Sequence, residues 1–356
     1  MIKSLSPYYI STPFISPLTS ETCSEYKMQL FIWDGLKASV PAEPEYEITK
    51  TNLASSIGND KIDIARMIND FVDFRPVGMT STGVYDGENQ RWIKTQIIYT
   101  TTDAADDDTI QLEATSLMTK GYSYGMDGEN ASTPTNNILL SGSEFKVYKS
   151  GFFTLPVLIS ESTTSPVTVK SYPANTIDYS NTIAASTTSA EMIKNIFVNV
   201  AEATSEDYIE IVYNSQTITL LITEECRYTP VDIAFQNKEG ALQFLTFFKA
   251  RTDTISTTSE EYESNTGQPN LWNHQHVKYN VQGRSKFKIN SGFVSEDLNE
   301  TFKQLLLSEK AYHLSGGVYI PLNLETTSLE YKSRQKDRLI NYEIEMSYAF
   351  NEINNI

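Results

Sequence analysis

The sequence predicts a mainly β protein, with two or three β-sandwich-like domains and a few short helices. Tyr (21) and Phe (16) are abundant, and such residues together with β-branched ones fit the pleated surface of a strand. Short runs in which apolar and polar residues alternate follow one another closely, with turn residues between them, as in a β-sandwich. With 356 residues the chain is long enough for several hydrophobic cores.

The first predicted domain covers residues 1–160. Its clearest strand lies at 25–33, where Tyr26, Met28, Leu30 and Ile32 share one face. Further strands are expected at 46–50, 91–102 and 110–118, and a hairpin-like pair at 136–160 closes the domain. One amphipathic helix is expected within 61–74, because Ile64, Met67, Ile68, Phe71 and Val72 follow helical spacing.

The second predicted domain, residues 161–225, is a small α+β or β unit. We expect a helix at 187–200, because Thr188 and Glu191 have the spacing of a capping box. The apolar stripe of this helix would consist of Ile193, Ile196, Phe197 and Val200. A hairpin should follow, with its turn at Asn214 and Ser215.

The third predicted domain, residues 226–356, is a β domain with one helix. Its first hairpin spans 231–248 and needs positive φ at Gly240. The second strand of that hairpin is apolar on both faces and should therefore be covered on both sides. The expected cover is a helix within 295–310, with Ser295 as N-cap and a stripe formed by Leu298, Phe302, Leu305 and Leu306.

Two strands, 318–324 and 341–350, should end the third domain. The turn between them carries basic residues at alternate positions: Lys332, Arg334, Lys336 and Arg338. This turn is either a contact for a neighbour's carboxylates or a solvated hairpin tip.

Charge and cysteine content narrow the class of partner. A net charge of −17 argues against a nucleic-acid partner, since phosphate binding requires clustered Lys and Arg. The N-terminal segment lacks a continuous apolar stretch, so we expect no signal peptide, no membrane span and synthesis in the cytoplasm. Cys23 and Cys226 are expected to be free thiols.

The sequence GYSYG, with Ser123 at its centre, resembles the nucleophile elbow of serine hydrolases. Such an elbow requires a helix directly after the serine, whereas Asp-Gly, Asn130 and Pro134 follow here. A turn is therefore the preferred interpretation of this segment, and a hydrolase is the weakest of the functional hypotheses.

Two groups of residues could hold a metal. The sequence DGEN occurs at 86–89 and 127–130, with an acidic run at 103–108 between the copies, and calcium binding there stays open. His274 and His276 form half of a zinc site that His313, Cys226 or a carboxylate would have to complete. Satisfied polar residues are the simpler explanation in both cases, so we assign no catalytic, cofactor-binding or metal-binding residue and expect no cofactor.

Several segments resemble virion structural proteins of tailed phages that infect Bacteroidetes-like bacteria. The similarity is greatest over residues 230–352 and includes 231–248, 289–314, 318–334 and 339–354; YEITKTN, DIARMINDFV and GYSYGMDGEN in the first domain are also similar. The resemblance implies a non-enzymatic component of a phage tail or baseplate, located in the virion. It also implies other tail or baseplate proteins as partners and a homo-oligomeric ring, with neither nucleic acid nor membrane. The alternative hypothesis is a carbohydrate- or receptor-binding adhesin module, because aromatic faces and Asn/Asp loops suit sugars.

Overall fold

A computed structural model shows a mainly β protein, as the sequence predicts. The structure describes residues 1–11, 23–51, 61–87, 90–101, 109–131, 134, 137–159, 165–172, 179–185, 192–202, 207–224, 227–264, 272–328 and 340–353. The chain forms two compact units, Met1–Ile222 with Gln236–Gln243, and Thr223–Phe235 with Phe244–Ile356. Each unit is described by itself.

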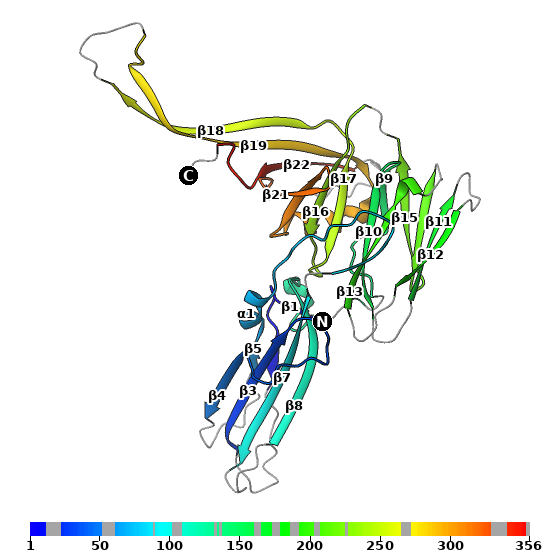
Figure 1. Ribbon diagram of the computed structural model, residues 1–356, viewed down its shortest axis with the longest axis vertical. Helices are drawn as coiled ribbons and strands as arrows, with labels where there is room; N and C mark the ends of the chain where they lie inside the picture. The colour runs from blue at the N-terminus through cyan, green and yellow to red at the C-terminus, as the bar shows by residue number, and fades with distance from the viewer. Residues whose placement is uncertain are drawn as a thin grey trace. The chain divides into compact units, whose positions relative to one another are not determined.

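The N-terminal part of the first unit is a five-stranded sheet with the order β1-β8-β7-β3-β4 (Figure 1). Its strands are β1 (Ile2–Lys3), β3 (Cys23–Trp33), β4 (Tyr46–Thr51), β7 (Gln90–Thr101) and β8 (Thr109–Thr119). A small second sheet pairs β2 (Tyr9–Ser11) with β5 (Lys61–Asp63). The alternating pattern of β3 is confirmed, because Tyr26, Met28 and Leu30 are buried on one face.

The predicted helix at 61–74 is shorter than expected. It consists of α1 (Ala65–Ile68) and the 3-10 turn η1 (Asn69–Phe71), and residues 61–63 form β5 instead. The predicted stripe is correct, since Ile64, Ile68 and Val72 are buried against Met28, Leu30 and Ile97 of the sheet. The first residues join β2 because Tyr9 and Ser11 offer a strand edge, which no local pattern at 61–63 reveals.

Two further sheets complete the first unit. One has the order β10-β13-β6 and the other has the order β12-β11-β14-β15-β9. Their strands are β6 (Gly83–Asp86), β9 (Glu144–Tyr148), β10 (Phe152–Ile159), β11 (Ser165–Tyr172), β12 (Tyr179–Ala185), β13 (Met192–Asn199), β14 (Tyr208–Tyr213) and β15 (Gln216–Thr223). The rings of Phe145 on β9 and Phe153 on β10 lie 5.1 Å apart, so the two sheets meet through their apolar faces.

The prediction of a helix at 187–200 was wrong. Residues 192–199 form β13, the central strand of its sheet, with Leu155 of β10 opposite Ile196 and Val84 of β6 on the other side. The apolar run suits a strand buried on both faces as well as it suits a helical stripe, so tertiary pairing decides. Thr188 and Glu191, the expected capping box, lie outside the described residues.

The hairpin at Asn214 and Ser215 is confirmed, with β14 and β15 on either side. Both turn residues have positive φ, 46° and 63°, which a two-residue turn of the primed type requires. The strand on each side alternates cleanly, with Ile209, Ile211 and Leu220 buried in the core.

The first unit continues across the predicted domain boundary at residue 160. β10 lies before that boundary and β13 lies after it, yet the two strands pair along their whole lengths. The backbone edge of β10 that pairs with β13 would be left without its partner if residues 1–160 folded as an isolated domain.

The second unit is built on a seven-stranded sheet with the order β17-β16-β20-β21-β22-β19-β18. Its strands are β16 (Val231–Gln236), β17 (Leu242–Phe247), β18 (Thr252–Glu263), β19 (His276–Val294), β20 (Ala311–Ser315), β21 (Val318–Leu324) and β22 (Ile340–Tyr348). The predicted strands at 231–248, 318–324 and 341–350 are therefore present. The basic turn from Lys332 to Arg338 lies outside the described residues.

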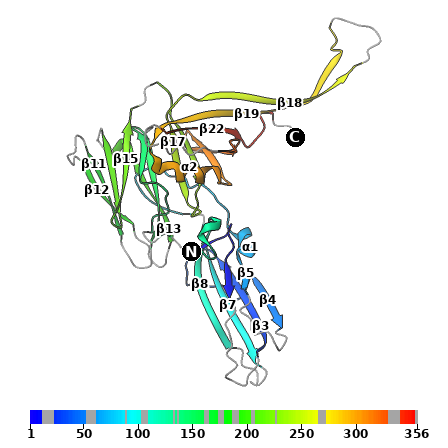
Figure 2. The same ribbon diagram turned by 180° about the vertical axis from the view of Figure 1, so that it is seen from behind.

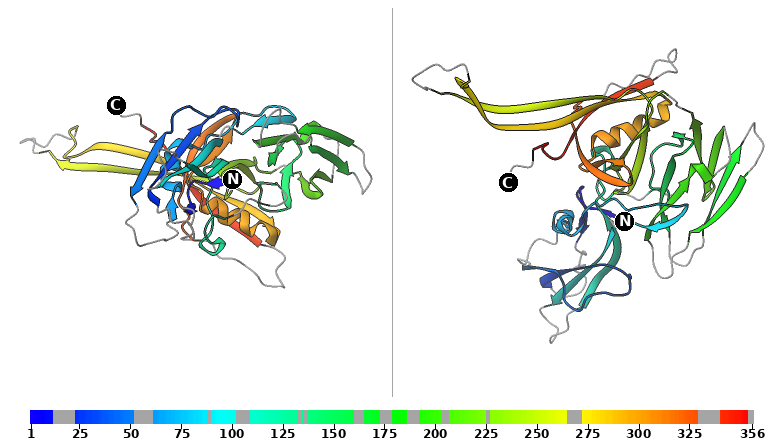
Figure 3. Two further views of the ribbon diagram at one scale, coloured as in Figure 1. Left: turned by 90° about the horizontal axis from the view of Figure 1, so that it is seen from below. Right: turned by 45° about the horizontal axis from the view of Figure 1, so that its top comes forward.

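The predicted C-terminal helix covers this sheet. It comprises the 3-10 turn η4 (Glu296–Leu298) and α2 (Asn299–Leu306), and it lies beside the sheet (Figure 2, Figure 3). The ring of Phe302 contacts Phe247 of β17 at 6.1 Å and Tyr342 of β22 at 4.5 Å between centroids. One side chain thus contacts the first and the fifth strand, which means that the sheet curves around α2.

Two further predictions concern the strand that this helix covers and the residue at which the helix begins. The expectation that β17 is covered on both faces is confirmed, since Leu242, Phe244, Leu245 and Phe247 are all buried. Ser295 lies at the N-cap of η4, as expected, but its side chain makes no capping hydrogen bond. The first turn at Glu296 is 3-10 rather than α, so the orphan N–H groups are not arranged as in an α-helical N-terminus.

Candidate interaction surface

The second unit carries an exposed two-stranded ribbon, which we call the arm. β18 pairs with β19 from Thr252 opposite Lys288 to Glu263 opposite His276. β19 pairs with β22 only from Lys286 to Val294, so beyond Lys286 the arm leaves the rest of its sheet (Figure 1). Every residue of β18 is exposed.

The root of the arm is anchored in the core of the second unit. Phe287 on β19 is fully buried, and the guanidinium of Arg251 lies 4.3 Å above its ring. Arg251 also donates a hydrogen bond to the Tyr348 hydroxyl at 3.2 Å and forms an ion pair with Asp253 at 2.6 Å. These contacts anchor the root of the arm in the core of the second unit.

The outer part of the arm has two different faces. Glu260 lies opposite Tyr279 and Tyr262 lies opposite Val277, so these four residues share one face. The rings of Tyr262 and Tyr279 lie 5.7 Å apart, and the residues are 51% and 47% exposed. A β-bulge at Asn280, which has φ 49°, sets this register.

The opposite face of the outer arm is charged. It carries Glu261 opposite Lys278, and Glu263 opposite His276. His276 Nδ1 lies 3.2 Å from a Glu261 carboxylate oxygen. On the tyrosine face, the Glu260 carboxylate accepts a hydrogen bond from the Tyr279 hydroxyl, and this hydrogen bond raises the pKa of Tyr279. The outer arm is therefore amphipathic, with its aromatic face open to solvent.

The arm was not predicted from the sequence. The segment at 252–263 contains no Gly, Pro or Lys and is rich in Thr and Ser, which favour strands without favouring burial. The segment at 276–288 is similarly polar on both faces. Two consecutive strand-forming segments without a buried face are the signal that could have identified an exposed ribbon.

The loop around Ser123 is a structural contact, and the turn interpretation of GYSYG is confirmed. β8 ends at Thr119, and the segment directly after Ser123 forms the three-residue 3-10 turn η2 (Gly125–Asp127) and not an α-helix. The Ser123 N–H donates to Ser6 Oγ at 2.6 Å, and the Tyr122 N–H donates to the Lys238 carbonyl at 2.8 Å. The loop thus joins the N-terminal segment to the turn at 236–243.

The side chains of the second DGEN copy contact protein groups. Asp127 forms an ion pair with Lys238 at 2.6 Å, and that hydrogen bond is the main reason why the pKa of its carboxyl is lowered. Glu129 pairs with Lys61, and Asn130 accepts from the Tyr9 N–H at 2.7 Å. In the first copy Asp86 pairs with Lys194, while the following Glu and Asn, like the acidic run at 103–108, lie outside the described residues.

The histidines of the hypothetical zinc site lie in different places. His276 is on the exposed arm, whereas His313 lies on β20. A hydrogen bond of 3.1 Å joins His313 Nδ1 to the Tyr348 hydroxyl. Burial is the main reason why the pKa of His313 is lowered, and the positive charge of Arg251 lowers it further. Among the described residues, no group of three His, Cys, Asp or Glu is placed to hold a metal. The side chains of Cys23 and Cys226 are outside the described part.

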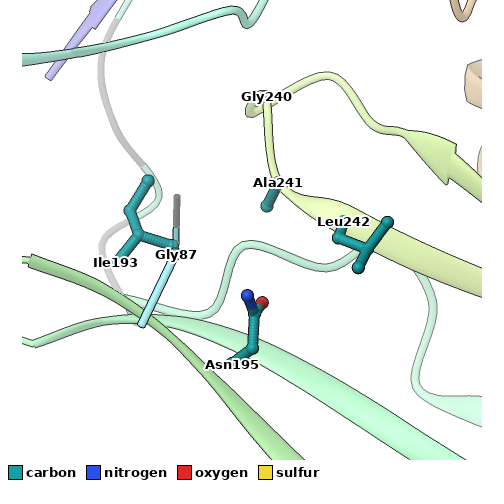
Figure 4. Close-up of a pocket in the computed structure, with 6 residues that line it drawn as sticks. All are labelled: Gly87, Ile193, Asn195, Gly240, Ala241 and Leu242. Atoms are coloured by element: carbon teal, nitrogen blue, oxygen red, sulfur yellow. The ribbon is translucent and has the colours of Figure 1, made fainter. Parts of the chain in front are cut away.

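A small pocket lies in the first unit between β13 and the turn at 236–243 (Figure 4). It is lined by Gly87, Ile193, Asn195, Gly240, Ala241 and Leu242. Asn195 is 3% exposed, and within the described residues its Oδ1 has no hydrogen-bond partner. The space that remains is about that of one water molecule, so the pocket fits an ordered solvent molecule rather than an organic substrate.

Comparison with known proteins adds no assignment. No protein-family model, no curated protein and no solved structure matches this chain. In the portion of the chain that the structure describes, no helix is long and apolar enough to cross a membrane.

Proposed function

We propose that this protein is a non-enzymatic structural component of a phage tail or baseplate, which assembles in the virion with copies of itself and with other tail proteins. The single observation that supports this function best is the arm, a ribbon of 12-residue β18 and its partner that is exposed over its outer length. Exposed strand edges in monomeric proteins are usually short, charged with Lys or covered. A long edge of this kind is expected to be covered by another chain.

The loops that resemble catalytic and metal sites also support a structural role. Ser123, Asp127 and Asn130 hold segments that are distant in sequence in the first unit. Their polar groups contribute to the fold through these contacts. The resemblance to virion proteins, described above from the sequence, gives the proposal its biological setting.

Two measurements test the proposal. Mass spectrometry of purified phage particles should find the protein at a fixed ratio to the other tail proteins, and its absence from particles would contradict the virion role. Sedimentation velocity of the purified chain should show species larger than 40.1 kDa that grow with concentration.

One specific observation favours binding of carbohydrate as a second candidate function. Tyr172 on β11 and Tyr208 on β14 lie opposite each other on the outer face of their sheet, with rings stacked at 4.7 Å and 7°. Glu210 accepts a hydrogen bond from the Tyr172 hydroxyl, which is the main reason why the pKa of Tyr172 is raised to about 12. Aromatic rings beside a carboxylate can bind the apolar face and the hydroxyls of a sugar. A glycan array with the intact chain and with Tyr208→Ala tests this role, and equal signals from both would reject this site.

A further inference from the structure

We propose that β18 of one copy adds to the outer part of β19 of a neighbouring copy, so that the arms of several copies form one continuous antiparallel sheet around a ring. This inference rests on the proposed assembly role and names both the partner, a second copy of this chain, and the strands that meet. Residues 252–263 of one copy would lie beside residues 276–282 of the next.

Both strands present backbone groups that can form a ladder. Among the strand pairings of the described residues, β18 pairs with β19 alone, and residues 276–282 of β19 pair with β18 alone. The free edge of β18 is therefore about 40 Å long at the usual rise of 3.3 Å per residue. It contains neither Lys nor Pro, two residues that commonly protect an exposed strand edge.

The strand directions permit a ring. β18 and β19 run antiparallel within one copy. If copies are related by rotation about an axis parallel to the arms, all arms point the same way, and β18 of the next copy then runs antiparallel to β19 of the first. Every junction in such a ring has the same antiparallel geometry as the ribbon itself, and a rotation that closes leaves no free edge.

The charges select this head-to-tail order over a two-fold pair. The outer part of β18 carries Glu260, Glu261 and Glu263 without a base, while residues 276–282 of β19 carry Lys278 without an acid. A junction of β18 with β19 places opposite charges side by side. A two-fold pair would place β18 against β18 or β19 against β19, and like charges across a ladder are destabilising.

Two bases nearer the root of the arm, Lys286 and Lys288, already have acidic partners. Lys286 forms an ion pair with Glu325 at 3.4 Å, and Lys288 forms one with Glu343 at 2.8 Å. Their charges are already matched inside the second unit, where β22 covers the edge of β19.

The exposed tyrosine face gives a second reason for neighbours. An isolated two-stranded ribbon is marginally stable in water, and three or more strands with an apolar face are needed for stability. Strand addition on both sides turns the arm into part of a larger sheet. Tyr262 and Tyr279, which contact each other across the ribbon, would then also contact the corresponding face of the next copy.

Shortening the arm tests the inference. Thr257 and Gly283 are cross-strand partners, so residues 258–282 can be replaced by Asn-Gly, which forms a tight two-residue turn at that point. The root, including Phe287 and its contacts, stays intact. Far-UV circular dichroism and thermal unfolding, both at a protein concentration at which the full chain is a single copy, serve as the folding control, since assembly itself raises the melting temperature.

The full chain should form a ring with a mass that is a fixed multiple of 40.1 kDa, and the shortened chain should stay a single copy in sedimentation velocity and native mass spectrometry. Hydrogen exchange of residues 252–263 and 276–282 should slow at least tenfold when the ring forms. A shortened chain that forms the same ring would overturn the arm as the contact while leaving the assembly role intact. Assembly of the full chain into two copies only would overturn the head-to-tail order. A full chain that stays a single copy at every concentration would overturn both the inference and self-assembly.

Discussion

Lys3 and Glu239 form an ion pair in the first unit, with Lys3 Nζ 2.9 Å from Glu239 Oε1 although the residues are 236 positions apart. Their side chains are 4% and 13% exposed. The pair joins the N-terminal strand β1 to the turn at 236–243, where Thr119 Oγ1 also donates to the Glu239 carbonyl at 2.9 Å. The contact shows that residues from the third predicted domain are part of the fold of the first unit.

Lys3→Met should destabilise the first unit by about 3 kcal/mol, since removing one partner leaves a largely buried charge without compensation. Urea unfolding followed by fluorescence measures this change. The double variant Lys3→Met with Glu239→Leu should recover part of the loss. Lys27→Met provides the matched control, because its pair with Glu47 is 36% and 43% exposed and should contribute less than about 1 kcal/mol. Equal losses at the two sites would contradict the role of burial.

Gly240→Ala should be much more costly than Gly128→Ala, although the two glycines have almost the same backbone angle, φ +77° and +76°. A Cβ at Gly240 would lie 2.7 Å from the Gly121 backbone nitrogen, whereas nothing lies within 4 Å at Gly128. Gly128→Ala therefore introduces only backbone strain, about 1–3 kcal/mol at its φ of 76° and ψ of −166°, and Gly240→Ala adds a backbone clash. Thermal unfolding of both variants checks the order, and similar melting temperatures would show that the turn moves freely.

Tyr85 on β6 should ionise at an unusually low pH. Hydrogen bonds from the Ser81 side chain, and then from its backbone, are the main reason why the pKa of Tyr85 is lowered to about 8. One tyrosinate should therefore appear near pH 8 in absorbance at 295 nm, and Tyr85→Phe should remove that step. Tyr172, with a pKa of about 12, should not contribute to it.

The low pKa of Tyr85 also makes the stability of the folded state depend on pH. The folded pKa lies below the unfolded value of about 10, so the folded state favours the charged form. Its contribution is complete above pH 10 and is lost as the pH falls through 8. Comparing the pH dependence of unfolding in the wild type and in Tyr85→Phe isolates this contribution, and identical curves would contradict it.

Replacing two acids on the arm should weaken assembly more than the same change in charge elsewhere. Glu260→Lys with Glu263→Lys makes both outer strands of the arm basic, so a β18-to-β19 junction would place like charges together. The matched control is Glu43→Lys with Glu45→Lys in an exposed part of the first unit. Both double variants change the net charge from −17 to −13, since each replacement adds two charges. The arm variant should need at least tenfold more protein to reach the same oligomer fraction, and equal behaviour of the two variants would count against the charge argument.

Some of the fold follows directly from local sequence. Residues 26–30 of β3 and residues 340–348 of β22 alternate between apolar and polar, so one face of each had to be buried, as Met28, Leu30, Ile344 and Met346 show. The turn at Asn214 and Ser215 and the positive φ of Gly240 follow from residue types that tolerate these angles. The stripe around Phe302 identified the helix that covers β17.

Less of the candidate interaction surface could be predicted from the sequence. GYSYG and the second DGEN copy are correctly predicted as turn segments, but the partners of Ser123 and Asp127 are Ser6 and Lys238. No spacing rule links such distant positions. The arm was missed because its strands have no buried face, and alternation of apolar and polar residues is the signal on which strand prediction depends.

The sequence by itself determined that this protein is mainly β, where its strictly alternating strands lie and which residues can make its turns. Only the tertiary structure decided that residues 192–199 form a strand, because Leu155 and Val84 supply partners on both sides of Ile196 that the local pattern does not contain. It also decided that the turn at 236–243 packs within the first unit and that β18 keeps a free edge. Backbone hydrogen bonds between strands join residues far apart in the chain, so the choice of partner depends on the packing of the whole sheet and not on the segment alone.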